Sequence, residues 1–118
     1  MDRNQRVLRM VFADIYELLC SKVERKGHLT ENVMLVIQWL TGYSKQELDK
    51  SIEDKVTFEQ FFARAPQINP KAKLIKGNIC GYKIQEIQDP FMWKVRCMDK
   101  LVDDLSKGKS LEKVLPAG

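Results

Sequence analysis

Three helix starts between Thr30 and Thr57 constrain the fold more than any other feature of the sequence. At Thr30, Ser44 and Thr57 a hydroxyl precedes a helical pattern, where it can accept hydrogen bonds from the unpaired N–H groups of the first turn. Each follows one apolar residue and has another four positions later, as in a hydrophobic staple. Glu47 and Gln60 complete capping boxes with the second and third. The sequence therefore predicts short helices joined by short turns.

The other helices are predicted from apolar spacing and from the positions of Gly and Pro. Apolar residues at helical spacing over residues 4–25 predict one long amphipathic helix that ends at Gly27. Asp89 and Pro90 predict another start, with Asp as the cap and Pro at the first helical position. The predicted helices outside residues 69–88 are 4–25, 31–41, 45–54, 58–64, 90–106 and a last short one after Ser110.

Residues 69–88 admit two interpretations. Asn69 and Pro70 resemble a cap followed by a first helical residue, which favours a helix closed by Gly81. Gly77 inside that helix would cost about 1 kcal/mol relative to Ala, so a short β-hairpin over residues 73–87 competes with it. The expected fold is all-α, with residues 1–118 in a single domain of five to six short helices. Residues 69–88 are then either irregular or a small β-hairpin.

The composition is that of a globular protein with one core. The chain has 118 residues, of which 44% are hydrophobic and 31% charged. A chain of this length can bury a core large enough to stabilise one domain without disulfides. Its three cysteines are an odd number at wide spacing, which indicates a reducing compartment. No apolar run is long enough to span a bilayer, and the N-terminus lacks the apolar core of a secretory signal. We therefore expect a cytoplasmic protein with no membrane partner.

Residue types that carry common catalytic chemistry are sparse. A structural zinc site takes about four Cys or His ligands, whereas the sequence has one histidine, His28, and no closely spaced cysteines. His28 follows Gly27 in a predicted turn, where an exposed imidazole without a catalytic role is expected. The segment 77–81 begins and ends with glycine, but it lacks the lysine and the Ser/Thr residue that follow the glycines of a phosphate-binding loop. We therefore assign no catalytic residue, metal ligand or cofactor, and expect a protein that is not an enzyme.

Positive charge is concentrated in the second half of the chain. Residues 60–118 contain eleven Lys/Arg and six Asp/Glu, and no acidic residue lies between positions 64 and 83. A basic surface of this kind can neutralise phosphates, so a nucleic acid is one candidate anionic partner. The glycine spacing around residue 81 also resembles a helix-turn-helix, although Pro90 would limit its second helix to about one turn. The candidate surface comprises Arg64, Lys71, Lys73, Lys76 and Lys83.

Two alternatives involve other partners. An acidic segment at 44–55 opposite the basic segment, together with Trp39 and Trp93 as candidate interface anchors, would suit a protein partner or self-association into a homo-oligomer. The competing interpretation is that both tryptophans flank the core. Their positions beside the apolar stripes of their helices favour this interpretation. A small-ligand pocket would use the aromatic and methionine side chains of Phe58, Phe61, Phe62, Tyr82 and Met92.

Several short strings occur together in an order and spacing that is specific. They are Trp39-Leu40-Thr41-Gly42-Tyr43, Phe61-Phe62 followed by Asn69-Pro70, Asp89-Pro90-Phe91-Met92, Asp99-Lys100-Leu101 and Lys107-Gly108-Lys109. In this combination the sequence resembles, over nearly its whole length, a family of short bacterial proteins catalogued as a domain of unknown function (number twenty-two hundred). The resemblance implies a stand-alone bacterial cytoplasmic domain, and it implies no activity, cofactor or catalytic residue.

Overall fold

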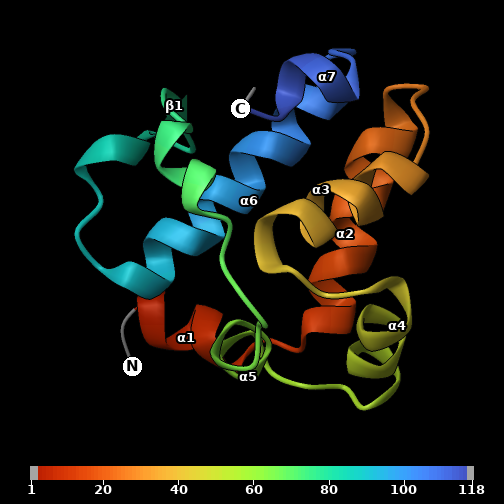
Figure 1. The fold of residues 1–118 in the computed structure, drawn as a ribbon, viewed down its shortest axis with the longest axis vertical. Helices are drawn as coiled ribbons and strands as arrows, with labels where there is room; N and C mark the ends of the chain where they lie inside the picture. Colours follow the sequence, from red (N-terminus) through yellow and green to blue (C-terminus); the bar gives the residue numbers. More distant parts are fainter. Residues whose placement is uncertain (1–2, 117–118) are drawn as a thin grey trace.

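Helix α6 (Pro90–Ser106) is the element against which most of the others pack (Figure 1). The computed structural model of the protein describes residues 3–116. Helices α2 (Phe12–Arg25) and α3 (Glu31–Thr41) both lie along α6, and α7 (Leu111–Val114) folds back onto its end. Asp89 caps α6 by accepting from the N–H of Phe91 at 2.9 Å, and Pro90 follows, as the sequence predicts.

The predicted long helix over residues 4–25 is wrong, because the chain breaks between α1 (Arg3–Arg9) and α2. The break lies where residues 10–12 meet the segment before α5 (Phe58–Ala63). Phe12 N–H donates to the Val56 carbonyl at 2.8 Å, and Phe58 N–H donates to the Met10 carbonyl at 2.7 Å. These tertiary hydrogen bonds replace the helical ones that an uninterrupted helix would need at this point.

Two of the three predicted caps are confirmed. Ser44 and Thr57 form complete capping boxes with Glu47 and Gln60 at the starts of α4 (Lys45–Glu53) and α5. The helix start predicted at Thr30 is also confirmed, since α3 begins at Glu31. The cap hydrogen bond expected of the Thr30 hydroxyl is not formed, and the Thr30 backbone is already helical.

Residues 69–88 adopt the hairpin alternative. The order is η1 (Pro70–Leu74), β1 (Asn78–Ile79), β2 (Tyr82–Lys83) and η2 (Ile84–Glu86), where η denotes a 3₁₀-helix and the strands are antiparallel. A longer helix over 70–80 and the helix-turn-helix interpretation are therefore both wrong. Gly77 has φ +107°, a conformation that only glycine adopts easily and that no helix can continue through.

The aromatic side chains proposed to line a ligand pocket form the core instead. Phe58, Phe61 and Phe62 are each at most 4% exposed, and Phe61 stacks on Phe12 with ring centroids 3.8 Å apart. Tyr82 lies apart from them at 38% exposure in the hairpin. Met92 is also buried, at 6% exposure, and with Tyr82 it borders a separate hollow. The five side chains therefore do not line one pocket.

The fold class is confirmed as all-α with one small β-hairpin. Residues 3–116 contain seven α-helices rather than five or six, because the predicted helix over residues 4–25 is divided into α1 and α2. The domain measures 33 × 31 × 27 Å. Within the described residues, no helix is both long enough and apolar enough to cross a lipid bilayer.

Candidate functional site

A groove of 470 Å³ lies between the η1–β1 connection, α6 and α7. Three lysines reach it from these separate elements: Lys76 from the connection, Lys100 from α6 and Lys113 from α7. We call this the lysine groove. Its lining residues are Leu74, Ile75, Lys76, Lys100, Leu101, Asp104, Lys113, Val114 and Pro116.

The floor of the lysine groove is apolar. Ile75, Leu101 and Val114 are each at most 6% exposed and belong to the hydrophobic core. Leu74 lies at the edge with 53% of its surface exposed. Of the three cations only Lys100 is largely shielded from water, at 17% exposure, whereas Lys76 and Lys113 are exposed. Water therefore screens the attraction of Lys100 for an anion less than that of the other two.

Lys100 is the most firmly held of the three cations. Its Nζ lies 3.1 Å from Oδ1 of Asp104, and the two side chains are only 17% and 13% exposed. Lys109 approaches the same oxygen at 3.7 Å. The η1–β1 connection passes close to Lys100, since a Cβ on Gly77 would lie 3.4 Å from Cε of Lys100, an ordinary contact distance. Asp104 is the one carboxylate among the lining residues, so the lysine groove keeps a net positive charge.

Only one of the lysines that the sequence grouped together lines the lysine groove. Lys76 lines the lysine groove, whereas Lys73 lines a second hollow beside Trp93. Lys71 is exposed on η1. Lys83 borders a third hollow and has a loose ion pair with Glu86 at 3.9 Å.

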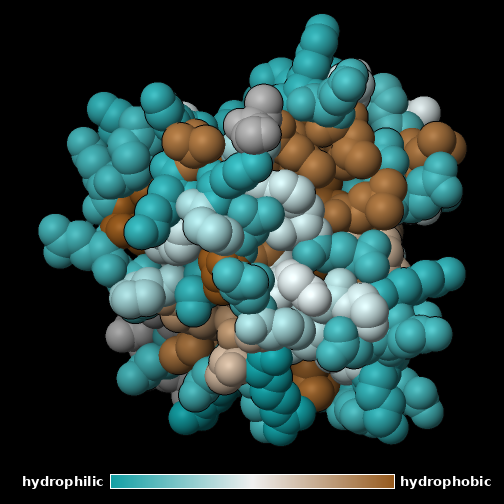
Figure 2. Space-filling view, in the orientation of Figure 1, coloured by the Kyte–Doolittle hydropathy of each residue, from teal (hydrophilic) through white to brown (hydrophobic). Residues whose placement is uncertain are grey.

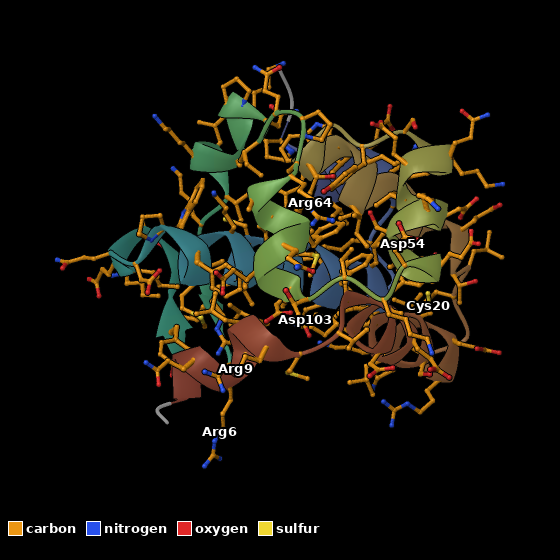
Figure 3. The ribbon with its side chains drawn as sticks, turned by 90° about the horizontal axis from the view of Figure 1, so that it is seen from below. Arg6, Arg9, Cys20, Asp54, Arg64 and Asp103 are labelled. Carbon is orange, nitrogen blue, oxygen red and sulfur yellow. The ribbon has the colours of Figure 1, made fainter. Side chains whose placement is uncertain are left out.

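Arg64 is separated from these lysines. It is the C-cap of α5, where Figure 3 labels it, and α5 and β1 lie at opposite ends of the view in Figure 1. The intervening chain is pinned along the end of α3, because Gln67 N–H donates to the Thr41 carbonyl and Asn69 N–H donates to the Leu40 carbonyl. The basic run from 64 to 83 is continuous in sequence but does not form one continuous surface.

Sequence reasoning missed Lys100 and Lys113. Lys100 stands four residues before Asp104 on α6, which suggests an ordinary intrahelical ion pair. Lys113 lies in a four-residue helix whose return onto α6 no local pattern predicts. Both join the site only through tertiary packing.

The two candidate anchors, Trp39 and Trp93, are half-buried and pack against the core. The Trp39 carbonyl accepts a hydrogen bond from Nδ2 of Asn69 at 3.3 Å, which ties α3 to the start of η1. Trp93 and Lys73 line the same hollow.

The remaining reactive side chains are dispersed. His28 is exposed, and a Cβ on Gly108 would lie 3.3 Å from its ring. Cys80 is exposed and Cys20 is half-buried, while Cys97 is fully buried, and burial raises its pKa to about 12. Among residues 3–116, no group of three or more His, Cys, Asp or Glu is arranged to hold a metal ion.

Comparisons with known proteins agree with this fold. The crystal structure of the uncharacterized protein SP1917 is similar to this chain, with 44% sequence identity and a TM-score of 0.90. The similarity covers 97% of this chain and 92% of that one. No curated protein matches the sequence. The sequence profile of the family described as uncharacterized protein conserved in bacteria (DUF2200) matches residues 6–116, so the chain belongs to this family.

Proposed function

We propose that this domain is a non-enzymatic binding protein whose lysine groove contacts the phosphate backbone of a nucleic acid. The observation that supports the proposal is the convergence of Lys76, Lys100 and Lys113 from three separate elements on one groove. Lysines act as point charges toward phosphates, so such contacts supply affinity without reading the sequence. Two further exposed lysines, Lys71 and Lys73, lie on η1, whose last residue, Leu74, lines the groove.

A protein partner is the second candidate function, and two observations favour it. Figure 2 shows an exposed hydrophobic region between α7 and α3 on a face that is otherwise mostly hydrophilic. Helix α4, on the other side of the molecule from β1, exposes the carboxylates of Glu47, Asp49 and Glu53. An apolar region beside charged segments is typical of a protein-binding surface.

The proposal is tested by fluorescence anisotropy of a labelled DNA of generic sequence, as a duplex and as a single strand, at several salt concentrations. We expect the logarithm of the binding constant to fall linearly with the logarithm of salt concentration, because bound phosphates release counterions. The double variant Lys76→Ala/Lys113→Ala should bind more weakly and reduce the salt slope by about two. Both side chains are exposed, so the variant should fold normally.

Lys45→Ala is the matched control, since Lys45 is an equally exposed lysine at the start of α4. It should leave both affinity and slope nearly unchanged. If it weakens binding as much as the double variant does, the lysine groove is not the site. Absence of binding even at low salt would overturn the nucleic-acid proposal and direct attention to the protein partner.

A further inference from the structure

The hollow beside Trp93 has a chemistry different from that of the lysine groove. It measures 330 Å³ and lies between η1, η2 and the start of α6. Its lining residues are Lys73, Gln85, Ile87, Gln88, Pro90 and Trp93, none of which is acidic. The hollow is thus bordered by a tryptophan, two apolar residues, two glutamines and a lysine.

We infer that this hollow binds a base of a single-stranded nucleic acid against Trp93, while the adjoining lysines hold its phosphates. The inference rests on the proposed function and names the class of nucleic acid. An aromatic ring can stack any base, and proteins that bind single strands combine such rings with a positively charged track for the backbone. Duplex bases are already stacked on each other and cannot enter the hollow.

The polar side chains suit a base with an attached phosphate. The amides of Gln85 and Gln88 each offer both a donor and an acceptor, as the edges of bases require. Gln85 is held in position by the hydrogen bond that it accepts from the Gly77 N–H at 3.3 Å. Lys73 supplies a positive charge at the same hollow. Ile87 and Pro90 provide apolar contact for the base or the sugar.

The two hollows are close enough to act on one strand. Lys73 lines the Trp93 hollow and Lys76 lines the lysine groove. They are three positions apart in the chain, so their Cα atoms are no more than about 11 Å apart. Exposed Lys71 stands on the same short helix, η1. We therefore expect a strand whose base lies at Trp93 to contact Lys73 and, by passing over η1, to reach the cations of the lysine groove.

The experiment uses the fact that the chain has only two tryptophans. In the variant Trp39→Phe, all tryptophan emission comes from Trp93, whose surroundings are unchanged. Oligothymidylate and oligouridylate of about ten nucleotides, within the usual site size of single-strand binders, serve as DNA and RNA probes. We expect both to quench the emission, with the same dissociation constant that anisotropy gives, and a duplex of equal length to leave it unchanged.

Substitution of Trp93 provides the second measurement. Trp93→Leu should weaken single-strand binding by about 5- to 150-fold and leave duplex binding unchanged. Trp93→Phe keeps an aromatic ring and the contact with the core, and should recover most of the affinity. This variant also separates lost stacking from lost folding, because both replacements flank the core in the same way.

The outcomes distinguish this inference from the proposed function. Binding of single strand and duplex with equal affinity, without quenching of Trp93, would overturn the stacking site and leave the lysine groove as a backbone-binding site. Quenching by one of the two oligonucleotides alone would confirm the hollow and assign its ligand to DNA or to RNA. Absence of binding by any nucleic acid would overturn both proposals.

Discussion

Two aspartates on α6 show how neighbouring positions can have opposite electrostatic surroundings. Burial raises the pKa of Asp99, although the Arg96 guanidinium 3.0 Å away acts to lower that pKa. Burial acts in the same direction on Asp103, but hydrogen bonds from Lys22 at 2.8 Å and Lys107 at 3.0 Å outweigh it and lower the pKa of that carboxyl. The ion pair with Lys22 also fixes α2 against α6.

Asp103→Asn should therefore reduce the free energy of unfolding at neutral pH, by about 1 kcal/mol for this partly exposed network. The carboxylate of Asp103 stabilises the fold above its unfolded pKa of 3.8, and this stabilisation is lost as pH falls through the lower folded pKa. Urea unfolding at neutral pH and at about pH 3 should show the difference between variant and parent shrinking on acidification.

Asp99→Asn is the contrasting control. Because the folded pKa of Asp99 is raised, its contribution is fully present below the unfolded pKa of 3.8 and is lost as pH rises through the folded pKa. The variant should therefore lack this loss of stability with rising pH. The same pH trend for both variants would contradict the assignment.

At the scale of the element, the ends of α2 and α3 differ in a way that their sequences do not reveal. Gly27 and Gly42 both follow a helix with φ near +80°, which a residue with a side chain adopts at a cost of about 1 kcal/mol or more. At Gly42 a Cβ would also lie 3.1 Å from the carbonyl oxygen of Gln67, whereas at Gly27 nothing lies within 4 Å. Gly42 is thus both a helix end and a backbone contact.

We predict that Gly27→Ala destabilises the protein by about 1 kcal/mol and that Gly42→Ala does so by about 2 kcal/mol or more. The second value is larger because backbone atoms of Gln67 would have to move away from the new methyl group. Chemical denaturation of the two variants, followed by circular dichroism, measures both. Equal losses would mean that the chain near Gln67 yields without resistance.

At the scale of the whole molecule, Cys97 is a reporter of global opening. It is 0% exposed in the core and burial raises its pKa to about 12, whereas Cys80 is exposed on the hairpin. Only the thiolate attacks a disulfide reagent. Reaction at Cys97 therefore needs the core to open.

The variant Cys20→Ser/Cys80→Ser leaves Cys97 as the single thiol of the chain. With an aromatic disulfide at mildly alkaline pH, we expect no reaction on the time scale at which Cys80 reacts in the parent protein. The rate should rise with urea in parallel with the unfolded fraction seen by circular dichroism. Rapid reaction without denaturant would show that the core opens locally around α6.

Local signals were sufficient wherever the structure depends on neighbours in sequence. The capping boxes at Ser44 and Thr57 and the Asp89-Pro90 start form as predicted, because each is completed within three residues. The hairpin alternative could also be weighed from sequence, since Gly77 disfavours a helix wherever it occurs. These features, the all-α class and the basic character of the second half required no knowledge of the fold.

Tertiary structure alone decided what depends on distant partners. The break before Phe12 exists because residues 10–12 and 56–58 exchange backbone hydrogen bonds, and no local pattern encodes that exchange. The lysine groove forms because α7 returns to α6, which brings Lys113 to Lys76 and Lys100. Arg64 does not line the groove, although it lies closer to Lys76 in sequence than Lys113 does. The sequence by itself thus determined most of the helix starts and the distribution of charge. Packing determined where the first helix breaks and which charges meet, because long side chains converge only where separate elements are held together.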